Sequence, residues 1–126
     1  MYNVQADTIN NILNINIYQQ SNQEIIQKML SKIENERKHF SSSYKSLVIL
    51  HEDISIMNNT NKDIDFTIFS GKLGNLRKAI IVYKKYSKVS KNTAEDLKNF
   101  YYNCGVNALT TNCLIEAKKA LNIFWK

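Results

Sequence analysis

Apolar residues recur at helical spacing along most of the chain, and this pattern predicts helices. The clearest case is "SNQEIIQKMLSKIENER", where the apolar residues 25, 26, 29, 30 and 33 form one stripe. Ser21 is placed to cap this helix, and Glu24 can reach back to complete a capping box. Another helix is expected over Val4–Tyr18, but its tail "LNINIY" alternates, so a short strand is the alternative there.

A polar loop is expected at Asn58–Asp63, with further helices on both sides of it. Before the loop, one helix carries Leu47, Val48, His51 and Ile54. After it come a short helix with Phe66 and Phe69 that ends at Gly71 or Gly74, a helix over Asn75–Lys88, a helix from Thr93 to Leu109, and a last helix from Cys113 to the end. The expected fold class is therefore all-α, with antiparallel helical hairpins.

Small residues fall inside two of these expected helices, at Gly105 and Ala117. A glycine within a helix costs about 1 kcal/mol relative to alanine. A close helix–helix crossing would offset this cost, because a missing side chain lets a neighbouring backbone approach. We therefore expect the last two helices to pack closely at Gly105, Ala108 and Ala117.

The segment "YYNCGVNALTTNCLIEAKKALNIF" resembles a tetratricopeptide repeat (TPR). The residues that carry this resemblance are Tyr101, Cys104, Gly105, Ala108, Ala117, Leu121 and Phe124. A looser copy precedes it, carried by Phe66, Thr67, Ser70, Gly74, Ala79, Tyr83 and Tyr86. The resemblance implies one helical domain, residues 1–126, with N-terminal helices in 1–58 and two TPR-like hairpins in 63–126. A plain helical bundle is the alternative.

Composition is that of an ordinary globular chain: 126 residues, 44% apolar, 22% charged and no proline. No apolar run approaches the roughly 20 residues that span a bilayer, and the start lacks the pattern of a signal peptide. We therefore expect a cytoplasmic protein that does not insert into membranes, with Cys104 and Cys113 as free thiols.

The net charge of +6 comes from one segment. Residues 66–94 hold seven basic side chains and no acidic one, whereas residues 1–65 hold six basic and eight acidic side chains. The candidate binding residues in this segment are Arg77, Lys78, Lys84, Lys85, Lys88 and Lys91. On the expected helix, Arg77, Lys84, Lys88 and Lys91 share one face. This face is either simply solvated or binds an acidic protein segment or a nucleic-acid backbone.

Signals of catalysis are poor, and we expect a protein that is not an enzyme, with no metal and no cofactor. His39 and His51 lack partners at ligand spacing, since the adjacent residues in "HED" point in different directions on a helix. Cys104 and Cys113 also lack the spacing of a zinc site. "SGKLGN" does not have the spacing of a phosphate-binding loop.

The function expected from these features is a non-catalytic protein–protein interaction module, such as an adaptor, chaperone or regulatory subunit. The TPR resemblance implies a groove that binds a peptide or helix, with Tyr101, Asn103 and Asn107 as candidate groove residues. Phe124 and Trp125 are expected at an exposed end that suits self-association or a larger assembly. The alternative is a small nucleic-acid-binding subunit that uses the basic segment 72–91.

Overall fold

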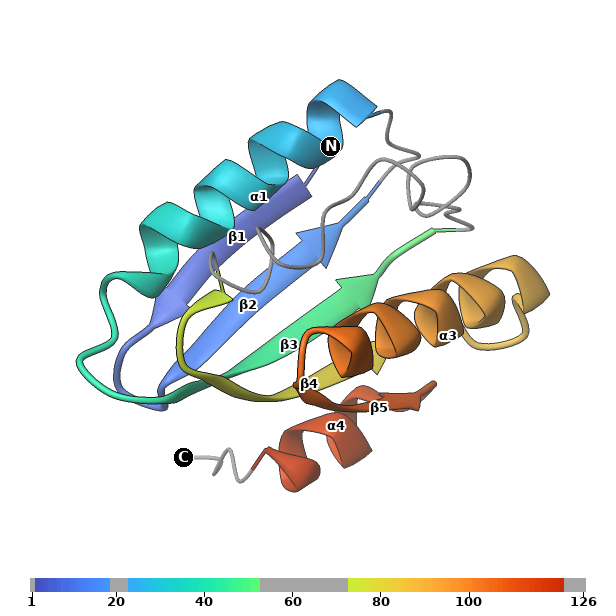
Figure 1. The fold of residues 1–126 in the computed structure, drawn as a ribbon. Coiled ribbons are helices and arrows are strands. Elements are labelled where there is room, and N and C mark those ends of the chain that lie inside the picture. The colour runs from blue at the N-terminus through green and yellow to red at the C-terminus, as the bar shows by residue number, and fades with distance from the viewer. Residues whose placement is uncertain (1, 19–22, 53–72, 122–126) are drawn as a thin grey trace.

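The described chain forms a five-stranded sheet with helices packed against it (Figure 1). The structure is a computed structural model that describes residues 2–18, 23–52 and 73–121. Its elements are β1 (Tyr2–Asp7), β2 (Ile12–Ile17), α1 (Gln23–Arg37), β3 (Tyr44–Leu50), β4 (Leu76–Val82), α3 (Lys88–Asn103), β5 (Asn107–Thr111) and α4 (Leu114–Ala120). The fold is α/β, so the all-α prediction is wrong.

The chain begins with an antiparallel hairpin of β1 and β2. At its turn, the Asp7 carboxylate accepts hydrogen bonds from the Asn10 side-chain amide at 2.8 Å and from the backbone N–H groups of Ile9 and Asn10. The bond from the Asn10 side chain contributes most to lowering the pKa of Asp7.

Because β1 and β2 are strands, the alternation in "LNINIY" indicated the correct structure, and the helix predicted over Val4–Tyr18 is wrong.

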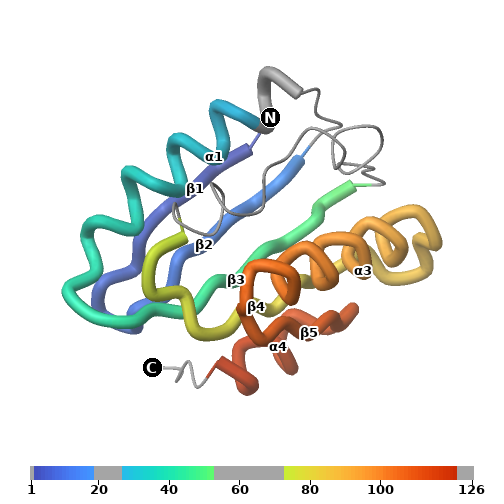
Figure 2. Tube along the Cα trace, in the orientation of Figure 1, coloured from blue at the N-terminus to red at the C-terminus, as the bar shows by residue number. Residues whose placement is uncertain are grey.

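The other strand pairings are parallel, and the sheet order follows the chain order. Helix α1 connects β2 to β3, and α3 connects β4 to β5. Each new strand is added on the same side of the previous one, so right-handed crossovers bring both helices to the same face of the sheet. Figure 2 shows the tube passing from α1 into β3 and from α3 into β5.

The central strands β3 and β4 are buried on both faces. Consecutive residues point to opposite faces of a strand, yet Leu47 and Val48 are each only 2% exposed, and Ile80 and Ile81 are at most 1% exposed. Such continuous apolar runs are typical of parallel strands covered on both sides. A buried helix gives the same short apolar runs, so the sequence pattern did not separate the two. The helix predicted to carry Leu47, Val48, His51 and Ile54 is wrong where the chain is described, because β3 lies there. The helix predicted over Asn75–Lys88 is wrong as well, because it contains β4.

Helix α1 was predicted correctly. It spans Gln23–Arg37 and packs on β1, with Met29 and Ile33 of the predicted stripe buried. The expected cap at Ser21 lies outside the described residues. The loop at Asn58–Asp63 and the short helix with Phe66 and Phe69 also lie outside them.

The two faces of the sheet carry separate apolar clusters. The larger one lies under α1 and α3 and contains Val4, Leu13, Ile15, Ile17, Met29, Ile33, Tyr44, Val48, Leu50, Leu73, Leu76, Ala79, Ile81, Ala94, Phe100, Tyr101, Val106 and Ala108. The smaller one lies under α4 and contains Ile12, Leu47, Ile80, Val82, Ala117 and Leu121.

Tyr44 belongs to the larger cluster. Burial raises the pKa of Tyr44 to about 12, and its hydroxyl donates a hydrogen bond to the carbonyl of Leu73.

Gly105 ends a helix instead of lying inside one. Its φ is +81°, and its N–H donates to the Tyr102 carbonyl at 3.0 Å, while the Val106 N–H donates to the Tyr101 carbonyl at 2.9 Å. This pair of bonds is a Schellman motif, in which a left-handed residue stops the helix. A Cβ at Gly105 would meet no atom within 4 Å. The close approach predicted at Gly105 is therefore absent, and α3 does not continue to Leu109.

The TPR-like hairpins are also wrong. Ala108 lies on β5, and Ala117 is buried on α4 against the smaller cluster of the sheet, so the two do not belong to packed antiparallel helices. In the looser copy, Ala79 lies on β4. Gly74, one of the two glycines proposed to end the short helix, has a positive φ of +63°. The last helix begins one residue after the predicted start, with Cys113 as its N-cap.

The first prediction concerns Gly105. Replacing it by alanine is expected to lower the free energy of unfolding by about 1 kcal/mol, because a Cβ disfavours the left-handed backbone although the site has space. Gly105→Asn is the matched control and should cost less, since asparagine tolerates this conformation. Urea unfolding measures both variants. Equal stabilities of the alanine variant and the wild type would contradict the assignment of a left-handed helix end at Gly105.

Candidate functional site

The basic residues of segment 72–91 do not share one helix face. Arg77 and Lys78 lie on β4, Lys84 and Lys85 follow the strand, and Lys88 and Lys91 lie on the first turn of α3. The face predicted for Arg77, Lys84, Lys88 and Lys91 is therefore wrong. Arg77 lies near the amino end of β4, whereas the four later lysines gather near its carboxyl end.

Lys78 has a structural role. Its ammonium group donates to the carbonyl of Ala120 at 3.1 Å, and the ammonium of Lys45 on β3 donates to the carbonyl of Leu121 at 3.3 Å. These carbonyls lie at the C-terminal end of α4, where the helix dipole favours positive charge. The two lysines thus fix α4 on the sheet, and Lys78 is removed from the set of candidate binding residues.

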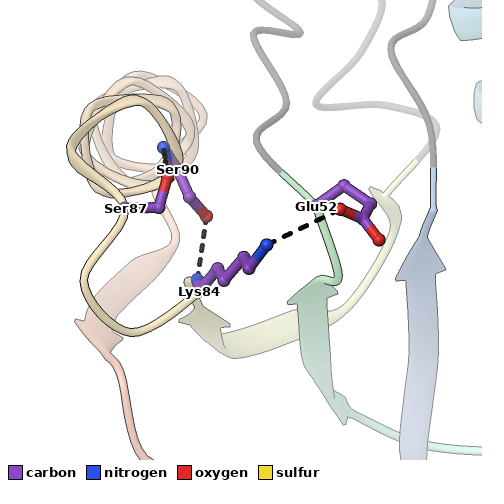
Figure 3. A network of polar contacts seen from close by, with 4 residues as sticks. All are labelled: Glu52, Lys84, Ser87 and Ser90. Atoms are coloured by element: carbon purple, nitrogen blue, oxygen red, sulfur yellow. Dashed lines mark hydrogen bonds and ion pairs between the residues drawn. The ribbon is translucent and has the colours of Figure 1, made fainter.

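The remaining lysines surround the loop between β4 and α3. We call Lys84, Lys85, Lys88 and Lys91 the lysine cluster. Helix α3 begins after Ser87, whose hydroxyl accepts from the Ser90 N–H at 3.0 Å. The Ser90 hydroxyl, fully buried, accepts in turn from the Lys84 N–H at 2.8 Å. The two serines therefore fix the loop on the helix end (Figure 3).

Glu52 is the acidic group that lies against the lysine cluster within the described residues. It follows β3, and its carboxylate lies 3.7 Å from the Lys84 ammonium, as Figure 3 shows. Both side chains are about half exposed or more, so water screens this pair and it adds little to stability. Lys85, Lys88 and Lys91 are also exposed, and the first turn of α3 contains no acidic residue.

Tyr86 stands at the tip of this loop in an unfavourable conformation. Its φ is +68°, a value that residues with a side chain seldom adopt, and it is 94% exposed. Within the described residues, its ring contacts the ammonium of Lys85, which lies 5.2 Å from the ring centroid. The burial of an apolar ring therefore does not explain this tyrosine, and backbone strain of this kind is typical of functional loops.

A polar and aromatic group lies beside the lysine cluster at the ends of β2 and β3. The exposed ring of His51 stacks on Tyr18 with the centroids 4.4 Å apart. The Nε2 atom of His51 lies 2.8 Å from the Oδ1 atom of Asn16. This histidine is next to Glu52 in sequence, so the group and the cluster occupy the same carboxyl edge of parallel strands, where ligands of open α/β sheets bind.

The groove residues predicted from the TPR resemblance do not form a groove. Tyr101 is only 4% exposed and belongs to the core, and burial raises its pKa. Asn103 is the last residue of α3, and Asn107 is the first residue of β5; both are exposed. Phe124 and Trp125 lie outside the described residues.

Sequence reasoning missed Tyr86, Tyr18 and the two serines as parts of this region. Tyr86 was assigned to a packing position of the looser TPR copy. The spacing of Ser87 and Ser90 directly before an amphipathic run was a signal for a helix start that the interpretation did not use. The stack of Tyr18 on His51 had no sequence signal, because a β2–α1–β3 crossover is needed to bring these two residues together.

The described residues contain no group of three side chains suited to hold a metal ion, and none of their helices is long and apolar enough to span a bilayer. Neither Cys104 nor Cys113 forms a disulfide, in agreement with the thiols predicted for them, and burial raises the pKa of the Cys104 thiol.

The sequence matches no protein-family model, and comparisons with curated proteins and with solved structures gave no match. The TPR resemblance is thus supported neither by a family match nor by the fold. The candidate site rests on the geometry of the chain itself.

The second prediction concerns the anchoring of α4. Lys78→Met is expected to lower the free energy of unfolding by about 1 kcal/mol, because it removes a charged hydrogen bond to the end of the helix. Lys85→Met is the matched control: Lys85 lies in the loop and is exposed, so its replacement should change stability by less than about 0.5 kcal/mol. Thermal or urea unfolding measures both. If Lys78→Met lowers the free energy of unfolding no more than Lys85→Met does, the structural role of Lys78 is contradicted.

Proposed function

We propose that this chain binds single-stranded nucleic acid, without catalysis, through the lysine cluster and the exposed ring of Tyr86. The observation that carries the proposal is the tyrosine itself: an almost fully exposed ring at φ +68°, in contact with Lys85, in the loop that leads from Lys84 to Lys88 and Lys91. Aromatic rings on which bases stack, placed beside positive charges that track the phosphates, are the usual means of binding single strands.

The electrostatics of α3 support a polyanionic partner. Lys88 and Lys91 occupy the first turn of the helix, where the dipole is positive and acidic residues are favoured. Like charges at this end destabilise the helix, and within the described residues the carboxylate of Glu52 pairs with Lys84. Phosphates of a bound strand would relieve this repulsion, because the positive end of a helix dipole favours anions.

The proposal replaces the groove of the expected interaction module, since that groove depended on the TPR fold. An acidic protein segment is the other partner that lysines favour, and it remains the competing outcome of the experiment. The ring of Tyr86 distinguishes the two, because base stacking requires it and charge pairing does not. A cytoplasmic location and the absence of catalysis stay predictions.

The third prediction uses the strain at Tyr86. Tyr86→Gly is expected to raise the free energy of unfolding by about 1 kcal/mol, because glycine adopts a positive φ without penalty. The same variant should bind a mixed-sequence 12-nucleotide strand roughly tenfold more weakly, since one base stack is lost. Tyr102→Ala is the control: Tyr102 is half exposed near the other end of α3, and its loss should leave affinity unchanged. Fluorescence anisotropy and urea unfolding provide the two readouts.

The salt dependence of binding gives a further test of the same site. Each lysine that contacts a phosphate of a single strand should contribute about 0.7 to the slope of log affinity against log salt. Lys85→Gln/Lys88→Gln should therefore reduce the slope by roughly 1.4, whereas Lys119→Gln on α4 should leave it unchanged. No binding of the strand at low salt, or binding of polyglutamate that survives Tyr86→Gly, would overturn the proposal in favour of an acidic protein.

A further inference from the structure

The β1–β2 hairpin presents a row of side-chain amides on the face opposite α1 and α3. The register pairs Asn3 with Asn16 and Gln5 with Asn14. The neighbours of these four residues along each strand, among them Val4, Leu13 and Ile15, point into the larger apolar cluster. Because side chains alternate along a strand, the four amides share the other face. We call Asn3, Gln5, Asn14 and Asn16 the amide face.

The described elements leave the amide face uncovered. The helix on this side of the sheet, α4, packs on β4 and β5. Asn3 and Gln5 are exposed, and Asn14 and Asn16 are partly exposed. Within the described chain, the side chains of Asn3, Gln5 and Asn14 have no hydrogen-bond partner, and the Asn16 side chain contacts His51. An exposed sheet face of this kind is well supplied with donors and acceptors.

The surroundings of the amide face favour the same partner as the lysine cluster. At its carboxyl end lie the stacked rings of Tyr18 and His51, followed by Glu52 and Lys84. At its other end, the carboxylate of Asp7 is engaged by the hairpin turn. The amides themselves carry no charge, so they do not repel a phosphate backbone that the lysine cluster holds at the carboxyl edge of the sheet.

We infer that the amide face binds the bases of the single strand whose phosphates contact the lysine cluster. This inference rests on the proposed function and extends it to base recognition. Asparagine and glutamine amides offer a donor and an acceptor together, which matches the edges of nucleobases. Single strands expose these edges and place their bases on sheet faces and aromatic rings, which here are Tyr18 and His51. In this arrangement the lysines bind the phosphates of the nucleic acid, and the amides hydrogen-bond with the edges of its bases.

The experiment compares two probes of equal length: a mixed-sequence 12-nucleotide strand and an abasic strand with the same sugar–phosphate backbone. The wild type is expected to bind the natural strand at least tenfold more tightly. Gln5→Ala/Asn14→Ala should lose most of this preference by weakening the natural strand severalfold, and its affinity for the abasic strand should stay unchanged. Asn92→Ala/Asn99→Ala, which removes two exposed amides from α3, is the matched control and should behave as the wild type.

The outcomes separate the two proposals. If the alanine pair keeps the full preference for bases, the amide face is not the base-binding surface, although the lysine cluster still binds the backbone. If neither probe binds at low salt, the proposed function fails and this inference fails with it. A change of sedimentation behaviour in the alanine pair without a change of affinity would assign the face to self-association and overturn the inference. Asn14→Asp is the second variant: it preserves side-chain shape and should weaken the natural strand by a similar or larger factor.

Discussion

The parallel pairing of β3 with β4 is the interaction on which the rest of the structure depends. Their paired residues include Leu47 with Ile80 and Val48 with Ile81. The first pair makes an apolar contact on one face of the sheet, and the second pair makes one on the other face. Both clusters of the core are built on these two strands. With both faces covered there, further strands are added only at the sides, and the sheet grows outward in chain order.

This centre also determines where chemistry can occur. The parallel strands end together, so residues that follow β2, β3 and β4 meet at one edge although they are far apart in sequence. Tyr18, His51 and Lys84 are brought together in this way, and no local pattern of the chain links them. Meanwhile α4 needs its own anchor, and Lys45 and Lys78 supply it from the same two central strands.

The sequence allowed only part of this to be predicted, for physical reasons that differ between elements. Helix α1 was predictable because only one of its faces packs on the sheet, so its apolar residues recur with the period of a helix. Strands β3 and β4 were not, because burial on both faces removes the alternation that identifies a strand. Gly105 was assigned wrongly because the sequence does not show whether a glycine lies inside a helix or at its end. The two hydrogen bonds of the Schellman motif, which only the structure shows, identify it as a helix end. For the site, charge counting located the basic segment, but it could not separate Lys78, which holds α4, from the exposed lysines, nor find Tyr86.

The lysines of this protein are of two kinds: some stabilise the fold, and others are placed where their charge opposes it. Lys45 and Lys78 donate to helix carbonyls at a negative helix end, where a positive charge stabilises the fold. Lys88 and Lys91 stand at a positive helix end, where the same charge opposes it. Tyr86 adds backbone strain at the same place. A protein is expected to retain features that weaken its fold where they serve another purpose. Unfavourable charge, unfavourable backbone and an exposed ring coincide in one loop, and this coincidence is a stronger argument for a binding site than the net charge of the chain.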